Sequence, residues 1–193
     1  MDYHEEIKGV KTVIVSFGGF AHAIGGIQPF EFFRFLESHF PYTDRLFYKD
    51  SKCMCYHKGV VGISTNIDET VIHIKSKIKG YNKVLFLGVS AGGYAALLFG
   101  SLLNVDFVLA FIPQTILHEE NKDPRYKNLR NILNEITSYH VYGDTTAQGI
   151  HCISHCENIN VLPNVNVIKK EHIDLKQIRD SGELKEILFS ILN

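Results

Sequence analysis

One serine in the chain is flanked by glycines at a spacing that suits a nucleophile. The stretch Gly88-Val89-Ser90-Ala91-Gly92 follows an apolar run at 83–87, typical of a buried strand, and precedes 94–99, a good helix former. Residues two before and two after such a serine lie where strand and helix crowd together, so both must lack a side chain. The context predicts a serine nucleophile on a strained turn, with the N–H of Ala91 positioned for an oxyanion. The alternative is an ordinary glycine-rich turn.

A second glycine loop is the candidate for the other half of an oxyanion hole. The β-rich run 12–17 ends at Gly18-Gly19. Glycines allow a backbone to approach a substrate and to aim N–H groups at it, so the expected donor is the N–H of Gly19 or Phe20. His22 lies in the same loop and is a candidate substrate contact. The alternative is a plain connecting loop.

An acid and a histidine follow the ends of two later predicted strands. Asp144 comes directly after Gly143 at the end of the expected strand 138–142, and His172 lies in the loop after 165–168. Parallel strands deliver their C-terminal loops to the same edge of a sheet, so Ser90, Asp144 and His172 are expected at one edge.

The expected elements alternate between strands and helices, which is typical of a parallel sheet with helices on both faces. The expected strands are 12–17, 45–49, 83–87, 106–112, 138–142 and 165–168. One expected helix begins directly after Ser90, and the others are 29–39, 66–79, 126–134, 147–157 and 175–192. Asn66 is the expected cap of the helix 66–79, and a break is expected near Ser181-Gly182 in the last helix. A length of 193 residues suits one domain over 1–193 and is too short for two ordinary domains.

With the chain order Ser, Asp, His, the sequence resembles the α/β-hydrolases over most of its length. It is also similar to compact hydrolase-like proteins associated with bacterial surface-polysaccharide genes, through Tyr56-His57-Lys58-Gly59, 110–115 and the ending 172–188. The resemblance implies a compact, single-domain α/β-hydrolase fold, a mostly parallel sheet of about six strands flanked by helices, and little or no cap domain. It implies Ser90 as nucleophile, His172 as general base and Asp144 as the carboxylate that orients the imidazole.

The identity of the acid is open. In the family the acid tends to follow the strand-ending glycine by a few residues, whereas Asp144 follows Gly143 directly. Glu157, an acid in the region 106–123, and a Ser-His dyad without an acid are the alternatives.

Three further stretches carry site hypotheses. Tyr56 and His57 follow the expected strand 45–49 and are candidate substrate contacts, with a purely structural role as the alternative. The polar stretch 114–128 is expected to overhang the pocket. The stretch 151–156 has His and Cys pairs one helical turn apart, but with Cys53 and Cys55 it matches no standard zinc spacing. The sequence therefore predicts no metal, and no cofactor is expected, because a serine, a histidine and backbone N–H groups supply the nucleophile, the proton shuttle and the oxyanion site.

Composition excludes several classes of partner. A net charge of −1 and a pI near 6.8 leave no basic stripe for nucleic acid. No apolar run approaches the ~20 residues of a membrane span. The acidic start, without a signal-peptide pattern, and four cysteines interpreted as reduced thiols predict a cytoplasmic protein.

These observations together favour an enzyme. The expected function is a serine hydrolase that acts on an ester, thioester or related acyl bond through a Ser90 acyl-enzyme, on a small-molecule or glycan-linked acyl substrate. An acyltransferase with the same acyl-enzyme is one alternative, and a hydrolase-fold binding protein without catalysis is the other.

Overall fold

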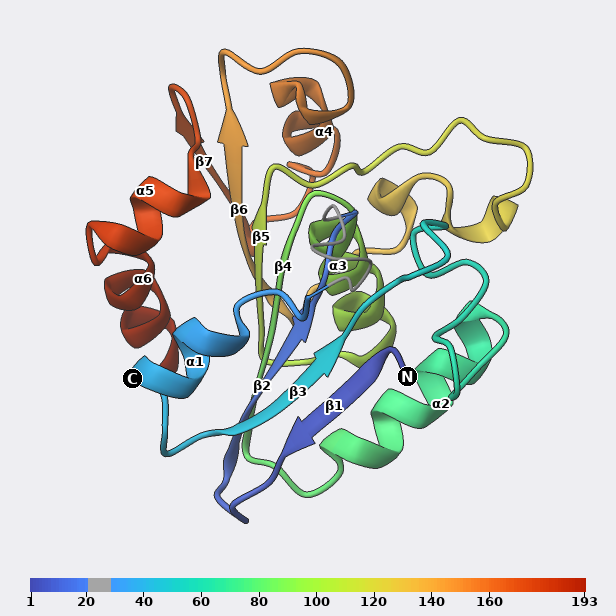
Figure 1. Cartoon of the computed structure of the whole chain (residues 1–193). Coiled ribbons are helices and arrows are strands. Elements are labelled where there is room, and N and C mark those ends of the chain that lie inside the picture. The colour runs from blue at the N-terminus through green and yellow to red at the C-terminus, as the bar shows by residue number, and fades with distance from the viewer. Residues whose placement is uncertain (21–28) are drawn as a thin grey trace.

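A seven-stranded sheet organises the computed structural model, which describes residues 1–20 and 29–193 (Figure 1). Its strand order is β1-β3-β2-β4-β5-β6-β7. β1 pairs antiparallel with β3, and the other neighbouring pairs are parallel. The strands are β1 (Tyr3–Glu6), β2 (Thr12–Phe17), β3 (Asp44–Tyr48), β4 (Lys83–Val89), β5 (Phe107–Phe111), β6 (Ser138–Asp144) and β7 (Val165–Lys170). The expected mostly parallel sheet of about six strands is confirmed, with one further strand at its edge.

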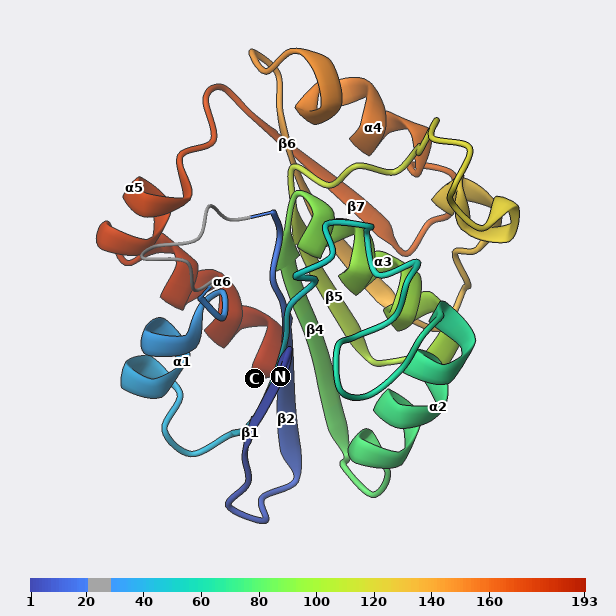
Figure 2. The same cartoon turned by 45° about the vertical axis from the view of Figure 1, so that its right-hand side comes forward.

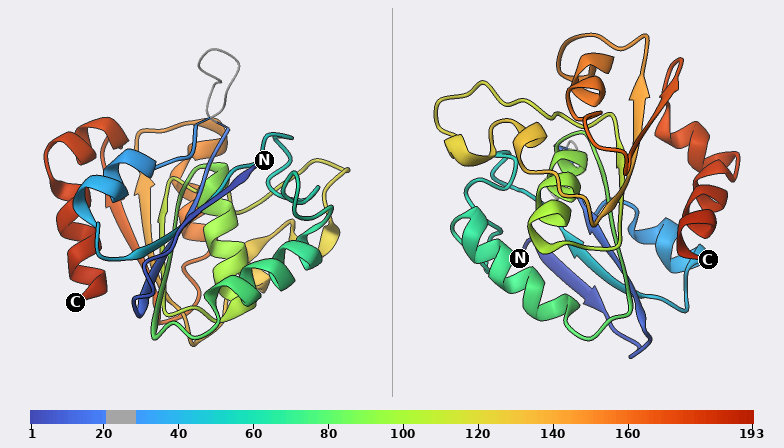
Figure 3. Two further views of the ribbon diagram at one scale, coloured as in Figure 1. Left: turned by 60° about the horizontal axis from the view of Figure 1, so that its bottom comes forward. Right: turned by 180° about the vertical axis from the view of Figure 1, so that it is seen from behind.

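Helices cover both faces of this sheet (Figures 2 and 3). On one face lie α1 (Phe33–His39), α5 (Leu175–Asp180) and α6 (Glu183–Leu192), which pack with the core around Phe47 and Leu87. On the other face lie α2 (Ile67–Ile78), α3 (Ala91–Leu103) and α4 (Ile153–Asn158), around a core that includes Phe86 and Phe99. The result is the three-layer arrangement that the alternation of strands and helices predicts.

Local sequence explains several of these boundaries. The Asn66 side chain accepts a hydrogen bond from the Glu69 N–H at 2.9 Å, so Asn66 caps α2 as expected. The expected break in the last helix is confirmed, because Gly182 has a φ of 87° between α5 and α6. α1 begins at Phe33 rather than at Pro29, since Phe32 has a left-handed backbone with a φ of 61°.

Two expected helices are wrong in extent. The stretch 126–134 forms separate 3₁₀ turns at Pro124–Tyr126 and Leu129–Asn131, each capped by a side chain, Asp123 or Asn128. Such local side-chain hydrogen bonds compete with a continuous helix. The stretch 147–157 divides into a 3₁₀ turn at Gly149–His151 and α4, because the backbone at Cys152 is extended. This division decides where the histidines of that stretch lie.

The edge strand β1 is missing from the sequence-based expectation. Its residues Tyr-His-Glu-Glu are polar and have no alternating pattern, and two of the four are exposed. A charged edge strand is held by backbone pairing on one side only, here with β3. Hydrophobic periodicity therefore could not reveal it.

Two remaining facts concern the chain as a whole. None of the helices in residues 1–20 and 29–193 is long and apolar enough to cross a membrane. All four cysteines are free thiols, and Cys55 and Cys156 are buried.

Candidate active site

Ser90 lies on a sharp turn between β4 and α3. Its backbone has φ 53° and ψ −118°, a conformation that non-glycine residues rarely adopt. A Cβ at position 88 would lie 2.1 Å from the Gly92 carbonyl oxygen, and one at position 92 would lie 2.1 Å from the Phe17 carbonyl oxygen. Both positions are therefore restricted to glycine, and the turn holds the serine at the C-terminal edge of the sheet.

The start of α3 and the loop after β2 lie next to each other beside this serine. Ala91 is the first residue of α3, so its N–H has no acceptor within the helix. A Cβ built on Gly19 would lie 3.9 Å from that nitrogen, so the loop after β2 runs next to the start of α3. The Gly19 N–H donates to the Glu31 carboxylate at 3.2 Å. Burial raises the pKa of that carboxyl group, and the N–H donor partly offsets the effect.

His151 is the histidine that contacts Ser90. Its Nε2 lies 2.7 Å from the Ser90 Oγ. With the hydroxyl as donor, Nε2 is the unprotonated nitrogen and Nδ1 carries the hydrogen. Burial lowers the pKa of this imidazole, so the ring is neutral at pH 7 and able to accept a proton. The pair has the geometry of a nucleophile with an adjacent general base.

Asp144, the last residue of β6, organises the two loops that carry the candidate bases. Its carboxylate accepts hydrogen bonds from the N–H groups of Thr146, Ala147, His172 and Ile173 and from the Thr146 hydroxyl, at 2.7–3.2 Å. Burial disfavours the charged form, but these hydrogen bonds outweigh it and hold the pKa of Asp144 well below its usual value.

His172 lies in the loop after β7, where the sequence placed it. Its backbone N–H donates to Asp144 at 3.2 Å, and its side chain is exposed. Across residues 1–20 and 29–193, its imidazole makes no hydrogen bond to Ser90 or Asp144. The structure thus brings Ser90, Asp144 and His172 to one edge of the sheet, but it pairs Ser90 with His151. The role of general base for His172 stays a prediction.

Replacing Asp144 with asparagine is expected to weaken both loops. The amide nitrogen cannot accept the hydrogen bonds that the carboxylate oxygen accepts, so the free energy of unfolding at pH 7 should fall by about 2 kcal/mol. The native carboxyl has a lowered pKa, so its stabilisation is complete above the unfolded pKa near 4 and is lost as the pH falls below it. Urea unfolding at pH 7 and pH 3 should therefore show a gap between native and variant that narrows in acid.

The same variant is expected to reduce turnover far more than it raises KM, because the loops that hold the base move while the substrate pocket remains. An unchanged kcat would remove Asp144 from the catalytic machinery. A gap in stability that stays constant from pH 7 to pH 3 would contradict the role of its ionised form.

The candidate substrate residues have different surroundings from those expected. Tyr56 is fully buried, and its hydroxyl donates to the Gly18 carbonyl oxygen at 3.0 Å, so it holds the backbone at Gly18 in place. His57 is also buried, which lowers the pKa of its imidazole to about 4. These positions leave little surface for a substrate, and the geometry favours structural roles. Phe20 is 39% exposed beside Gly19, whereas His22 lies outside the described residues.

The stretch 114–128 is attached to the body of the protein. The His57 Nδ1 accepts the Asp123 N–H at 2.8 Å, and the Tyr94 hydroxyl donates to the Tyr126 carbonyl at 2.8 Å. At the other end, Thr115 donates to the His155 Nδ1 and carbonyl oxygen. The expected overhang is thus anchored at three points along its length.

The two histidines of 151–156, considered as possible metal ligands, bind different partners in the structure. His151 faces Ser90, whereas His155 accepts a hydrogen bond from the Thr115 N–H at 3.1 Å. In the part of the chain that the structure describes, no group of three or more His, Cys, Asp or Glu residues is arranged to hold a metal ion.

The chain is similar to known proteins in its structure and not in its sequence. No protein-family model and no curated protein matches the sequence. Solved structures do match. One is a mutant of the capsule O-acetyltransferase of Neisseria meningitidis serogroup A in complex with CoA. It aligns with a TM-score of 0.67 and 14% identity, over 99% of this chain and 91% of that one. Esterase 2 of Thermogutta terrifontis aligns with a TM-score of 0.64 and 13% identity, over 95% and 83%. The fold is that of the α/β-hydrolases.

A third neighbour is a fluorophosphonate-binding serine hydrolase of Staphylococcus aureus with substrate bound. It aligns with a TM-score of 0.59 and 11% identity, over 97% of this chain and 86% of that one. At such identities the likeness describes the fold. The α/β-hydrolase resemblance expected from the sequence is confirmed at that level.

Two site residues, His151 and Glu31, are not predicted by the sequence pattern. The sequence pattern indicates His151 only as a possible metal ligand, although Gly149, two residues before it, signals a break in the expected helix. Glu31 falls within the expected helix 29–39, but it precedes α1, and its side chain reaches Gly19. Both contacts are between residues distant in sequence, so no local pattern reveals them.

Proposed function

We propose that the protein is a serine hydrolase that cleaves an ester, thioester or related acyl bond through a Ser90 acyl-enzyme. The observation that carries the proposal is the distance of 2.7 Å between the Ser90 Oγ and the His151 Nε2 on a strained strand-to-helix turn. A strained serine conformation has a cost in stability and is typical of functional sites. The turn after this strand is where α/β-hydrolases carry their nucleophile, so Ser90 is proposed to serve as the nucleophile.

The proposed reaction has two halves. The His151 Nε2 takes the Ser90 hydroxyl proton as the Oγ attacks the acyl carbon, and the imidazolium then gives that proton to the leaving alcohol or thiol. The N–H groups of Ala91 and Gly19 are proposed to donate to the tetrahedral oxyanion. For this the Gly19 N–H gives up its hydrogen bond to the Glu31 carboxylate and donates to the oxyanion instead. In the second half a water molecule, deprotonated by His151, attacks the acyl carbon and releases the acid with Ser90 restored.

His172 is the competing general base, because its loop follows β7 and is tied to Asp144. In this account His151 acts on the proton, Asp144 positions both loops, and His172 is dispensable for proton transfer. No carboxylate in residues 1–20 and 29–193 accepts a hydrogen bond from the His151 ring, so the proposed unit is a Ser-His dyad.

An acyltransferase is the second candidate, favoured by the capsule O-acetyltransferase among the structural neighbours. Here an acceptor hydroxyl takes the place of water in the second half of the reaction. The test is a set of 4-nitrophenyl acyl esters assayed with and without sugar alcohols. Nitrophenol release that ends in free acid supports a hydrolase, and a new ester formed faster than the acid supports a transferase. If Ser90→Ala turns over these esters as fast as the native protein, both candidates fail.

A further inference from the structure

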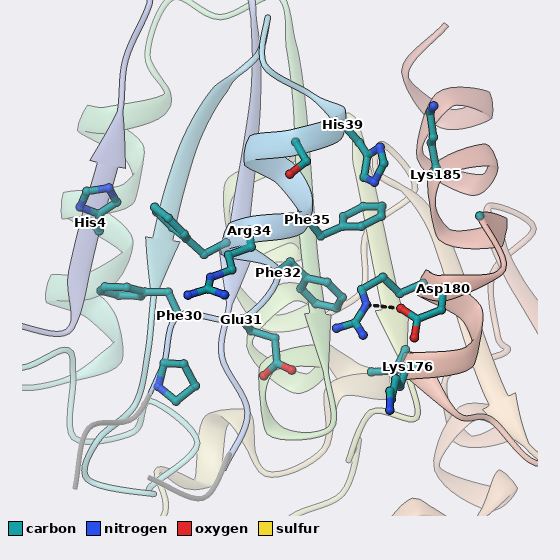
Figure 4. A pocket seen from close by; sticks show the side chains of 16 residues that line it. His4, Phe30, Glu31, Phe32, Arg34, Phe35, His39, Lys176, Asp180 and Lys185 are labelled. Atoms are coloured by element: carbon teal, nitrogen blue, oxygen red, sulfur yellow. Dashed lines mark hydrogen bonds and ion pairs between the residues drawn. The ribbon is translucent and has the colours of Figure 1, made fainter. Parts of the chain in front are cut away.

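A cavity of about 1090 Å³ separates α1 from α5 and α6, on the sheet face opposite α2 and α3 (Figure 4). This volume suits a small organic ligand. Neither Ser90 nor His151 lines it. Its connection with the candidate active site is Glu31, which lines the cavity and accepts the Gly19 N–H.

One wall of this cavity is aromatic. Phe30, Phe32, Phe33 and Phe35 line it from α1 and the segment before α1. Phe32 has a φ of 61°, which is unusual for a bulky side chain, and its half-buried ring lines the cavity. Strained residues of this kind cluster at ligand sites. The wall offers an apolar ligand a large contact area.

The other wall is cationic. Lys176, Arg179 and Lys185 line it from α5 and α6, and Arg34 adds a fourth cation from α1. Figure 4 shows Lys176, Asp180 and Lys185 across the cavity from Phe32 and Phe35. Asp180 pairs with Arg179 at 2.8 Å. Within the described chain, Arg34, Lys176 and Lys185 have no carboxylate partner. The cavity therefore carries excess positive charge in a chain whose net charge is −1.

We infer that this cavity binds a soluble amphipathic anion, a molecule with an apolar alkyl or aryl body and a phosphate, sulfate or carboxylate group. The body would pack on the phenylalanine wall, and the anionic group would pair with the lysines of α5 and α6. The half-buried Glu31 carboxylate repels the anionic end of the ligand from the Gly19 side of the cavity, so the apolar end is oriented toward Gly19. This inference goes beyond the proposed function and does not depend on it.

The test is isothermal titration calorimetry on the folded Ser90→Ala protein, which removes turnover. The probes are octyl phosphate, octyl glucoside and inorganic phosphate, each below micelle-forming concentrations. Octyl phosphate is expected to bind with a Kd at least about tenfold lower than either control, because only it satisfies both walls. Equal affinity for octyl phosphate and octyl glucoside, or no heat of binding with octyl phosphate, would overturn the inference.

Two charge variants locate the binding. Lys176→Glu with Lys185→Glu should raise the Kd for octyl phosphate by about tenfold and leave octyl glucoside unchanged. Lys58→Glu with Lys75→Glu makes the same charge change at two exposed positions outside the cavity and should change the Kd by less than about twofold. Equal effects of the two pairs would contradict the cavity as the site. The protein is also tested against phosphatidylglycerol vesicles by cosedimentation. Cosedimentation that depends on Lys176 and Lys185 would overturn the inference of a soluble ligand and indicate that the cavity faces a membrane surface.

Discussion

Replacing His151 with alanine is expected to lower kcat for acyl-ester hydrolysis by about 10³-fold, because Ser90 loses the base that accepts its proton. The residue is half-buried and packs at the end of a short 3₁₀ turn, so the variant should stay folded. The measurement is steady-state hydrolysis of the best 4-nitrophenyl ester, with circular dichroism as the check of folding.

The matched control is His172→Ala, which removes the other candidate base. Its side chain is exposed, so the structure itself should tolerate the change. In our account its kcat stays within about tenfold of the native value. The reverse pattern, a large loss with His172→Ala and a small one with His151→Ala, would assign the base to His172 and contradict the proposed dyad.

Replacing Gly88 with alanine is expected to have the largest effect on stability. The new Cβ would lie 2.1 Å from the Gly92 carbonyl oxygen and 2.8 Å from the Gly93 nitrogen. Both are backbone atoms of the first turn of α3, which is buried and cannot move aside. We expect a loss of about 3 kcal/mol or more in the free energy of unfolding, measured by urea denaturation.

The control for this variant is Gly18→Ala in the neighbouring loop. A Cβ at position 18 would meet the Lys49 Cβ at 3.4 Å, an ordinary contact, and the backbone there needs no positive φ. Its stability should stay within about 1 kcal/mol of the native protein. Equal losses at the two positions would mean that steric crowding at the serine turn is not what restricts position 88. If Gly88→Ala yields no soluble protein, comparison of urea midpoints for Gly92→Ala and Gly18→Ala provides the same test.

The serine turn was predictable because its information is local. Gly88, Ser90 and Gly92 lie within one short stretch of sequence, and an apolar strand and a helix former flank that stretch. The alternation of strands and helices predicted the sheet for the same reason. The edge strand β1 was missed because its pairing with β3 depends on the backbone and leaves no hydrophobic pattern.

The partner of Ser90 could not be predicted in this way. Which of ten histidines reaches the serine depends on how residues 145–152 turn after β6. In the expected continuous helix, His151 and His155 would share a face. The extended backbone at Cys152 separates them, so His151 reaches Ser90 and His155 reaches Thr115. The role of Glu31 likewise depends on a contact across a loop.

The most direct test of the central claim is intact-mass spectrometry after treatment with a fluorophosphonate, which labels activated serines. We compare the native protein with Ser90→Ala, His151→Ala and His172→Ala. The account predicts one adduct on the native protein, none on Ser90→Ala, strongly slowed labelling of His151→Ala and near-native labelling of His172→Ala. A folded native protein that takes no label, or that is labelled equally without Ser90, would contradict an activated serine at this turn.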